Sequence, residues 1–476
     1  MLSQEQLTAG LADALERAPG LSHLGPAQSG KVRDAWPLGG GKRLLVTSER
    51  VSAFDRVLGT IPYKGQVLNQ LSAWWFEKTK ALVKNHLLAV VDPNAMVVRD
   101  AEPLPVEVVV RGFITGVTST SLWTLYKDGV ERPYGLELPE GLHKDDRLPR
   151  PVITPTTKAG PGQHDARLSP HEIEDRLVDR VLWKRVTDAA IALFEEGQRV
   201  AEAAGLLLVD TKYEFGLVNG ELCLIDEIHT PDSSRYWLKS AWEARLQTGQ
   251  PPEHLDKELL RLELKAMGYS GDGPAPALPD ALRTRLGGKY IELFERLTGT
   301  TFEPGAPPHA RLWSRVTTPI VPILMGSKSD LEHARHVQKA LESFGVQSDL
   351  RIASAHKSPA RLLDVIEQYE TDPRPKVYVA IAGRSNALSA MLCAAVTAPV
   401  VSCPPYSDRF GGADVFSSLR MPSGVAPALV LDPDNAAFFC AKVLGLQDAG
   451  MRQRVAAVQA QHRERLRRDD EELARG

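Results

Sequence analysis

Cysteine is scarce in this sequence, and the cysteines present are not paired. Four occur among 476 residues, and none forms a C-x-x-C motif with another. Zinc sites and disulfide frameworks both need cysteines at close, regular spacing, so neither is expected. The sequence also shows no apolar run long enough to span a bilayer and no basic N-terminal region followed by an apolar block. We therefore expect a cytoplasmic protein.

An excess of charge of either sign is lacking as well. The chain carries 57 lysines and arginines against 60 aspartates and glutamates, a formal net charge of −3. A nucleic-acid binder that works by electrostatics needs a positive field, so this class is not favoured. Acidic residues follow the arginines at 463–468, which predicts a solvated C-terminal helix. With 43% hydrophobic and 25% charged residues, the chain has a globular composition, and its length predicts two or three domains.

The pattern of predicted strands and helices changes near residue 300 and divides the chain into two regions. Residues 1–300 mix β-rich and helical stretches, and within them 95–100 and 106–113 are expected to pair as antiparallel strands. Residues 301–319 contain four prolines and little periodicity, which predicts a linker. Residues 320–476 alternate short apolar strands with helical patterns. This alternation predicts a three-layer α/β/α domain of Rossmann or flavodoxin type, with helices on both faces of a parallel sheet.

A predicted hairpin with charged side chains on one face is the strongest feature of the N-terminal region. Its two strands meet at Asn219-Gly220, a dipeptide that favours a two-residue turn. Because side chains alternate along a strand, Lys212 and Glu214 share one face, to which Asp226 can add a second carboxylate. Two carboxylates on adjacent strands suit Mg²⁺, which takes oxygen ligands and often bridges them to phosphates. A solvent-facing hairpin with a lysine–aspartate pair explains the pattern equally well.

Short motifs around the hairpin carry further chemistry. The loop at 30–33, G-K-V-R, can cover nucleotide phosphates, although G-K-x-R is also common by chance. The stretch 230–237 is dense in hydroxyls and holds an acid and an arginine. It can bind an anionic substrate or serve as an ordinary turn capped by aspartate.

Taken together over residues 20–245, these motifs resemble the SAICAR synthase family (phosphoribosylaminoimidazole-succinocarboxamide synthase). The motifs in family order are G-K-V-R-D, S-A-F-D, I-P-x-K-G, V-V-R-G-x-x-T-G, T-P-T-T-K-A, D-T-K-x-E-F-G and T-P-D-S-S-R-x-W. The resemblance implies a two-lobed α+β domain and an ATP-dependent ligase. Such a ligase joins an imidazole carboxylate to L-aspartate through an acyl phosphate, and this chemistry depends on positioning and charge neutralisation.

The resemblance also implies roles for individual residues of this sequence. The implied ATP contacts are Gly30, Lys31, Arg33 and Lys212. The implied ligands of Mg²⁺ are Glu214 and Asp226. The implied contacts to the ribotide and the aspartate are Arg111, Ser119, Asp232, Ser233 and Arg235. The loop at 116–121 is longer than the compact T-G-S-x-W form of some members, so the residue that meets the ribotide phosphate stays open among Ser119, Thr120 and Ser121.

Four predicted strands of the C-terminal region end in small polar loops, at 325–330, 354–359, 382–386 and 402–405. Ligands collect at the C-terminal ends of strands in open α/β sheets, and helix N-termini there favour an anion. His356 lies in one of these loops and not on an apolar helix face, so a functional role is favoured over a structural one. The loops match neither a P-loop nor a G-x-G-x-x-G fingerprint. A small phosphorylated ligand beside a histidine is therefore predicted.

These loops resemble the AIR carboxylase family (phosphoribosylaminoimidazole carboxylase) over residues 320–445. The motifs are M-G-S-x-S-D, S-A-H-K-x-P, A-G-R-S-N and V-x-S-C-P-P. The A-G-R-S-N form resembles the class that takes CO₂ directly, and the resemblance implies no ATP, metal or other cofactor in this half. It implies proton transfer at the imidazole C4 by His356, with Lys357 and Ser354 nearby. The implied ribotide contacts are Ser327, Ser329, Asp330, Arg384, Ser385 and Asn386.

The product of the C-terminal reaction is the substrate of the N-terminal reaction. We therefore hypothesise that the chain converts 5-aminoimidazole ribonucleotide (AIR) to its carboxylated form (CAIR) and then to SAICAR. The domain order resembles that of the fused bifunctional enzyme of animals. The family resemblance further implies a homo-oligomer, an octamer formed through the carboxylase half. Two rivals remain: a non-catalytic ribotide-binding scaffold, and a small-molecule kinase whose ADP release needs no aspartate.

Overall fold

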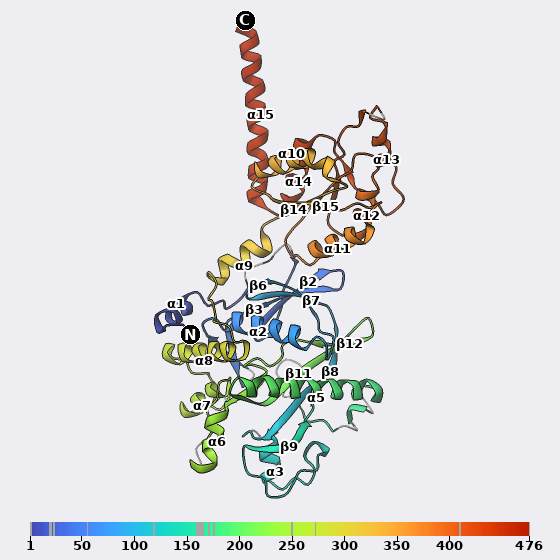
Figure 1. Cartoon of the computed structure of the whole chain (residues 1–476). Coiled ribbons are helices and arrows are strands. Elements are labelled where there is room, and N and C mark those ends of the chain that lie inside the picture. Colours follow the sequence, from blue (N-terminus) through green and yellow to red (C-terminus); the bar gives the residue numbers. More distant parts are fainter. Residues whose placement is uncertain are drawn as a thin grey trace. The chain divides into compact units, whose positions relative to one another are not determined.

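The chain, described by a computed structural model, divides into two compact units (Figure 1). The first unit consists of residues 1–20 and 24–312, and the second of residues 21–23 and 313–476. The structure describes residues 2–18, 21, 24–54, 56–117, 120–158, 166–169, 172–174, 177–248, 251–271, 273–408 and 411–475. Within these ranges we find no helix with the length and apolar character that crossing a membrane requires.

Two antiparallel sheets form the frame of the first unit. The first sheet contains, in spatial order, β1 (Gln28–Ser29), β2 (Arg33–Gly39), β3 (Lys42–Thr47), β7 (Ala95–Arg99) and β6 (Leu87–Asp92). The second sheet contains β10 (Thr156–Thr157), β8 (Glu102–Ile114), β11 (Leu206–Val218) and β12 (Glu221–Ile225), with β13 (Ser234–Leu238) beside β11 and β9 (Asp146–Ile153) beside β8. A separate two-stranded sheet consists of β4 (Arg50–Ala53) and β5 (Arg56–Thr60). Helices and antiparallel sheets in one unit confirm the predicted α+β class.

Helices cover these sheets and close the core of the first unit. They are α1 (Gln4–Ala12), α2 (Lys64–Thr79), α3 (Leu122–Lys127), α5 (Arg180–Ala203), α6 (Lys239–Thr248), α7 (Glu258–Ala266) and α8 (Asp280–Thr298). The α5 helix packs on β11 and buries an apolar stripe that recurs every three or four residues from Trp183 to Val200. Its first turn is capped by Asp179, whose carboxylate accepts two backbone N–H bonds.

The hairpin predicted at Asn219-Gly220 is confirmed. Asn219 has φ 52° and Gly220 has φ 78°, the two left-handed residues that a tight two-residue turn needs. On β11 the side chain of Tyr213 is fully buried, whereas those of its neighbours Lys212 and Glu214 lie on the opposite face and contact each other. The alternation read from the sequence therefore places the charged face as predicted.

The pairing predicted between residues 95–100 and 106–113 is wrong. β7 pairs with β3 and β6 in the first sheet, whereas β8 pairs with β9, β10 and β11 in the second. Residues 100–101 carry the chain from one sheet to the other. A run of alternating apolar residues identifies a strand and its buried face, but it does not identify the partner strand.

The second unit is built on one parallel sheet, as predicted. Its spatial order is β15 (Gln347–Ile352), β14 (Ile320–Met325), β16 (Tyr378–Ile381), β17 (Val400–Ser402) and β18 (Ala428–Leu429). One face packs against α10 (Leu331–Glu342), α14 (Pro433–Leu444) and the start of α15 (Ala449–Arg475). The other face packs against α11 (Pro359–Glu370) and α12 (Ala387–Ala395). The three-layer α/β/α architecture is thus confirmed, and a short α13 (Phe416–Leu419) lies in the long loop after β17.

Most of helix α15 is exposed to solvent, as the sequence predicts. Among its described residues only Met451 and Val455 are buried. The side chains of Arg467 and Arg468 both pair with Glu464 one turn earlier. These arginines thus form ion pairs within their own helix, which Figure 1 shows at the C-terminal end of the chain.

Residues 301–319, expected as a linker, are not irregular throughout. α9 (Pro308–Thr317) occupies their second half, and Phe302 packs in the core of the first unit. Arg311 pairs with the buried carboxylate of Asp92 at 2.5 Å, and the Gln66 amide donates to the carbonyl of Glu303 at 2.8 Å. These contacts tie the segment to the first unit, whose boundary therefore falls at residue 312.

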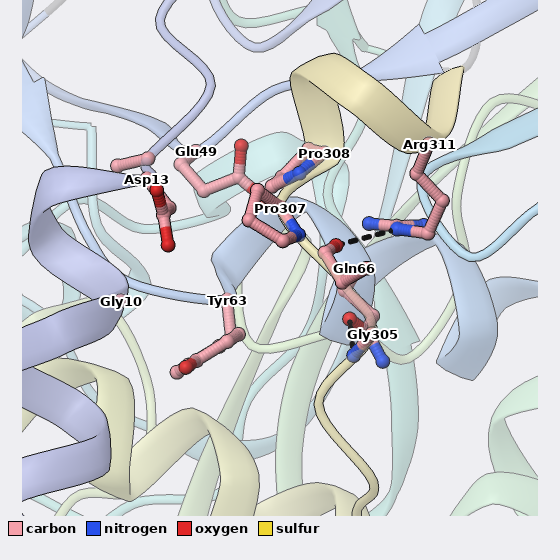
Figure 2. A pocket seen from close by; sticks show the side chains of 11 residues that line it. Gly10, Asp13, Glu49, Tyr63, Gln66, Gly305, Pro307, Pro308 and Arg311 are labelled. Carbon is pink, nitrogen blue, oxygen red and sulfur yellow. Dashed lines mark hydrogen bonds between the residues drawn. The ribbon is translucent and has the colours of Figure 1, made fainter. Parts of the chain in front are cut away.

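A small cavity of about 30 Å³ lies beside this segment (Figure 2). Asp13, Glu49, Tyr63 and Arg311 are among the side chains that surround it. A cavity needs about 10–15 Å³ to hold one water, so this one has room for little more than a water or two. None of the predicted site residues lines it.

Candidate active sites

A cluster of carboxylates and lysines lies on the charged face of the second sheet. Lys212 on β11 places its Nζ 2.7 Å from Glu107 and 2.9 Å from Glu214. Lys158, from the segment after β10, reaches the other oxygen of Glu214 at 2.5 Å. Glu214 faces Glu107 in the strand register of β8 and β11, which explains why one lysine can bridge both carboxylates.

The first sheet contributes an arginine to the same place. Arg33 on β2 pairs with Asp226 and, at 2.8 Å, with Glu227. The glycine-lysine loop that contains Gly30 and Lys31 directly precedes this arginine, and both of those residues are exposed. The predicted ATP-contacting loop and the predicted metal ligands, about 190 residues apart, are therefore brought together.

The charges of this cluster shift the pKa values of two carboxyl groups in opposite directions. Burial opposes ionisation of Glu214, but the ammonium groups of Lys212 and Lys158 lower its pKa to about 2. Burial and the neighbouring carboxylates of Glu214 and Glu227 raise the pKa of Asp226 to about 6, against the attraction of Arg33. Ionisation of Asp226 is thus costly even beside Arg33, and a further cation at this carboxylate would offset the cost.

This donor set fits Mg²⁺. Glu214 and Asp226 supply carboxylate oxygens, and Asp226 keeps about a third of its side chain exposed, so an ion can reach it. Among the described residues no group of three or more His, Cys, Asp and Glu side chains is placed to hold a metal. An ion here would therefore complete its shell with substrate oxygens and water, as Mg²⁺ usually does.

The turn after β12 is held in a strained conformation. Asp226 has φ 64° and His229 has φ 53°, left-handed values that cost non-glycine residues about 1–3 kcal/mol. The ring of His229 contacts the Tyr213 hydroxyl at 2.5 Å. The backbone carbonyl of His229 accepts a hydrogen bond from the Tyr236 hydroxyl at 2.8 Å. Gly197 leaves room for the ring, since a Cβ there would lie 2.6 Å from it. The surroundings therefore impose the turn and fix the direction of its carboxylates.

Two buried histidines beside this turn should make the folded state sensitive to acid. Burial lowers the pKa of His229 to about 3, and burial together with the charge of Arg33 does the same for His86. Between pH 6.5 and 3 the unfolded chain then binds more protons at these sites, so they stabilise the fold fully above pH 6.5 and less as pH falls. The raised pKa values of Glu49, about 7, and Asp226 act in the opposite direction.

Only a comparison of variants therefore isolates the histidine contribution. His229→Gln should change the slope of unfolding free energy against pH by about 1.4 kcal/mol per pH unit between about pH 4 and 5.5. Urea unfolding followed by tryptophan fluorescence measures this slope. The matched control is His143→Gln, because His143 is exposed. Equal slopes for the unaltered chain and His229→Gln would contradict the assignment.

Two of the residues predicted to bind the ribotide and aspartate share one partner. Arg111 donates to Asp210 at 2.7 Å and to the Thr154 hydroxyl at 2.9 Å. Arg235 approaches the other oxygen of Asp210 at 3.5 Å. Burial lowers the pKa of Arg111, with Asp210 opposing it. Burial also opposes the charge of Arg235, but the carboxylates of Asp210, Glu258, Asp256 and Asp145 raise its pKa. Asp210 thus contacts both guanidinium groups, whose other N–H groups can donate to an anionic ligand.

The remaining predicted contacts that the structure describes lie in the neighbouring loops. Ser119 lies outside the described residues. The hydroxyl of Ser121 caps α3, and the carbonyl of Thr120 accepts a hydrogen bond from a tyrosine. Ser233 contacts Thr230 within the turn at 3.2 Å. Asp232 lies in a separate buried cluster of lysines and a tyrosine.

Several side chains around these sites were missed by the sequence analysis. Lys64, Lys158 and Glu227 lie inside or beside the quoted motifs, so the motifs themselves could have pointed to them. Lys257 and Tyr290 come from residues 251–300, where no motif was recognised. Only the fold brings these two to Asp232.

In the second unit, three polar loops meet at one edge of the parallel sheet. Met325 at the end of β14 is in register with Ile352 on β15 and Ile381 on β16. The loops that follow these strands carry the predicted residues Ser327, Ser329, Asp330, Ser354, His356, Lys357, Arg384, Ser385 and Asn386. The prediction that these strand ends lie together is confirmed.

Asp330 organises the first of these loops. Its carboxylate accepts the backbone N–H of Ser327 at 3.2 Å, and the hydroxyls of Ser327 and Ser329 lie 2.5 Å apart. Gly383, in the loop after β16, lies beside this carboxylate and beside Pro405. Hydroxyls, a carboxylate and exposed backbone are thereby presented at the start of α10.

The other two loops meet above the end of β14. The Nε2 of His356 lies 3.5 Å from the Ser385 hydroxyl, at the limit of a hydrogen bond. The Ser354 hydroxyl accepts the backbone N–H of Lys357 at 3.2 Å and so fixes that loop. His356 and Arg384 are both exposed. The histidine can therefore exchange protons with a ligand that binds across this edge.

Each unit thus gathers titratable and hydroxyl side chains at one place on a sheet, the arrangement that small-molecule enzymes use. The chain is a two-domain enzyme.

Comparisons with known proteins identify the family of each half of the chain. The SAICAR synthetase family model matches residues 26–276, and the AIR carboxylase family model matches residues 320–465. The chain belongs to the SAICAR synthetase family and carries an AIR carboxylase domain on the same polypeptide, which makes it a bifunctional enzyme of purine biosynthesis.

The chain is also similar to individual relatives and solved structures. The chain is 48% identical over 281 residues to phosphoribosylaminoimidazole-succinocarboxamide synthase of Legionella pneumophila (strain Lens). The aligned region covers 58% of this chain and 89% of the relative. A SAICAR synthase structure from Saccharomyces cerevisiae, complexed with SAICAR, is 31% identical with a TM-score of 0.54, and the match covers 61% of this chain and 100% of that one. The structure of PurE from Treponema denticola is 44% identical with a TM-score of 0.32, over 33% of this chain and 98% of that one.

Proposed function

We propose that the chain catalyses two consecutive steps: carboxylation of AIR with CO₂ to give CAIR, and ATP-dependent condensation of CAIR with L-aspartate to give SAICAR. The observation that carries this proposal is the presence of both family domains in one chain, because the product of one reaction is the substrate of the other. The A-G-R-S-N loop at 382–386 supports the direct use of CO₂.

In the carboxylase unit, the polar loops at the sheet edge bind the ribotide. The proposed contacts are Ser327, Ser329, Asp330, Arg384, Ser385 and Asn386. The imidazole C4 attacks the carbon of CO₂, a C–C bond forms, and the proton on C4 must leave. His356 accepts that proton, with Lys357 and Ser354 beside it, and the exposed position of the histidine between two loops supports this role.

In the ligase unit, the CAIR carboxylate attacks the γ-phosphorus of ATP, and ADP leaves. The aspartate amine then attacks the carbonyl carbon of the acyl phosphate, loses a proton and displaces phosphate. We propose that Gly30, Lys31, Arg33 and Lys212 position ATP. We propose that Arg111, Ser119, Asp232, Ser233 and Arg235 bind the ribotide and the aspartate. The pairing of Arg33 with the carboxylate cluster supports the common location of these groups.

Glu214 and Asp226 would hold Mg²⁺, which supplies charge neutralisation for the phosphoryl oxygens. In the ligand-free chain Lys212, Lys158 and Arg33 balance the same carboxylates. These cations can turn to the nucleotide phosphates when a metal takes their place, because each is a long and flexible side chain. The proposal thus explains why carboxylates and basic side chains lie together in this cluster.

We also propose that the chain forms a homo-oligomer, an octamer, through its carboxylase unit. Tyr406 and Leu446 are each more than 70% exposed, and Phe416 and Leu419 are more than half exposed. Large apolar side chains at this exposure favour burial against another subunit. Sedimentation of the intact chain tests this proposal, and a single species at the monomer mass of 52.1 kDa would contradict it.

The proposed function is tested by an assay with AIR, bicarbonate, ATP, Mg²⁺ and L-aspartate in which each component is omitted in turn. Omission of aspartate, ATP or Mg²⁺ should leave CAIR formation intact and abolish SAICAR formation. Omission of bicarbonate should abolish both. Failure to form CAIR would favour a binding scaffold, and steady ADP release without aspartate would favour a kinase.

A further inference from the structure

Asp232 is the centre of a buried cluster that contains two lysines. Its Oδ2 accepts a hydrogen bond from Lys64 Nζ at 2.8 Å, and its Oδ1 accepts one from the Tyr290 hydroxyl at 2.6 Å. Lys257 Nζ lies 3.7 Å from Oδ2, which is too far for a hydrogen bond. Both oxygens of the carboxylate are therefore already engaged by partners other than Lys257.

The two lysines differ in their access to solvent. Lys64, the first residue of α2, has a completely buried side chain, so no ligand can reach its ammonium group. The side chain of Lys257 keeps 16% of its surface exposed. The hydrogen bond that its ammonium group donates goes to the neutral hydroxyl of Ser52 at 3.1 Å. The buried lysine thus has a hydrogen-bonded counter-ion, whereas the accessible one donates to an uncharged hydroxyl and lies 3.7 Å from the Asp232 carboxylate.

The environment of Lys257 disfavours its charge in the ligand-free chain. Burial lowers its pKa, and the charges of Lys64 and Arg261 add to this effect, while Asp232 and Glu227 oppose it. A ligand that brings a carboxylate to this ammonium group would offset the cost of burying the charge.

The backbone around Lys257 holds the side chain at this place. The N–H of Lys257 donates to the carbonyl of Pro231, next to Asp232, at 3.2 Å. The buried carboxylate of Asp256 accepts the backbone N–H groups of Tyr236 and Glu258, both at 2.7 Å. The start of α7 is therefore fastened to the turn that carries Asp232, and the lysine is preorganised before any ligand arrives.

We propose that Lys257 binds a carboxylate of the amino-acid substrate, L-aspartate, and so selects for a dicarboxylic amine. This inference rests on the proposed ligase function. L-aspartate carries two carboxylates, and either of them would give the Lys257 ammonium group a hydrogen-bonded charged partner. Lys64 and Tyr290 position Asp232 and do not meet the substrate. Residues 251–300 thereby gain a task in the ligase site beyond packing.

Steady-state kinetics of Lys257→Met in the full chain test this inference. The KM for L-aspartate should rise about 10- to 100-fold, because a charge-assisted hydrogen bond is lost. The KM values for ATP and CAIR should stay within about twofold of those of the unaltered chain. The inhibition constant of succinate, which has both carboxylates but no amine, should rise as much as the KM for L-aspartate. Lys265→Met is the matched control, since Lys265 is exposed at the other end of α7.

A second substitution separates the charge from its surroundings. Lys257→Arg keeps the positive charge and should keep the KM for L-aspartate within about tenfold of the unaltered value. An unchanged KM for aspartate in Lys257→Met, or an equal rise for all three substrates, would overturn the inference alone. If Lys257→Met fails to fold, as judged by its melting temperature, Lys257→Gln replaces it with the same expected result. Failure of the unaltered chain to form SAICAR would overturn the proposed function instead.

Discussion

His356→Asn should lower the rate of AIR carboxylation by at least about 100-fold, because a positioned acid–base group contributes about 10²–10⁴-fold. Asparagine can still form a polar contact with Ser385, but it cannot accept the proton that leaves the imidazole C4. His356 is exposed in the loop after β15, so its replacement removes no core packing. The initial rate of CAIR formation from AIR and bicarbonate, followed by absorbance, measures the effect.

The same variant should leave CAIR-to-SAICAR ligation within about twofold of the unaltered rate, since sites without shared partners behave independently. His336→Asn is the matched control, because His336 is an exposed histidine of α10 in the same unit. Its carboxylation rate should not change. An equal loss of both reactions in His356→Asn would contradict the assignment of two separate sites.

Asp226→Asn should lower ligation by at least about 100-fold and spare carboxylation, because charge stabilisation by a metal is worth several kcal/mol in the transition state. Asparagine has the same shape as aspartate and can still accept a hydrogen bond from Arg33, so the left-handed turn should survive. The loss should be accompanied by weaker Mg²⁺ binding, measured as the Mg²⁺ concentration that half-activates ligation. An unchanged Mg²⁺ requirement would show that the metal role of Asp226 is wrong.

The pH dependence gives this prediction a second readout. Because the pKa of Asp226 is raised to about 6, an ion that binds below pH 6 must displace a proton. Mg²⁺ affinity of the unaltered chain should therefore fall about tenfold per pH unit below pH 6, and the Asp226→Asn variant should show no such fall. Glu221→Gln is the matched control, since Glu221 lies on β12, the strand that precedes Asp226, but is exposed and pairs with Lys84.

The polar loops of the second unit could be placed from the sequence because parallel strands impose a simple rule. Every strand of such a sheet points the same way, so the loops after β14, β15 and β16 must lie on one edge. The hairpin of the first unit could be predicted from the sequence equally well. Asn219-Gly220 specifies a tight turn, and alternation places Lys212 beside Glu214.

The antiparallel sheets of the first unit obey no such rule. β7 and β8 follow each other along the chain, but they belong to different sheets, because a strand can pair with any segment whose apolar face complements its own. The structure of the predicted linker, residues 301–319, also depends on contacts with distant segments. Prolines at 304, 307 and 308 suggested an irregular segment, but Arg311 finds a buried carboxylate at Asp92, more than 200 residues earlier in the chain.

The sequence by itself determined the two families, the α/β/α sheet with its loop edge, and the charged face of the hairpin, because these depend on motifs and on periodicity within short segments. Only the tertiary structure decided which charges meet. Arg33, from the first sheet, pairs with Asp226, which follows a strand of the second sheet. The side chains around Asp232, namely those of Lys64, Lys257 and Tyr290, come from three separate segments. Such contacts join residues far apart in the chain, and their energy depends on burial and distance, which no local pattern of residues contains.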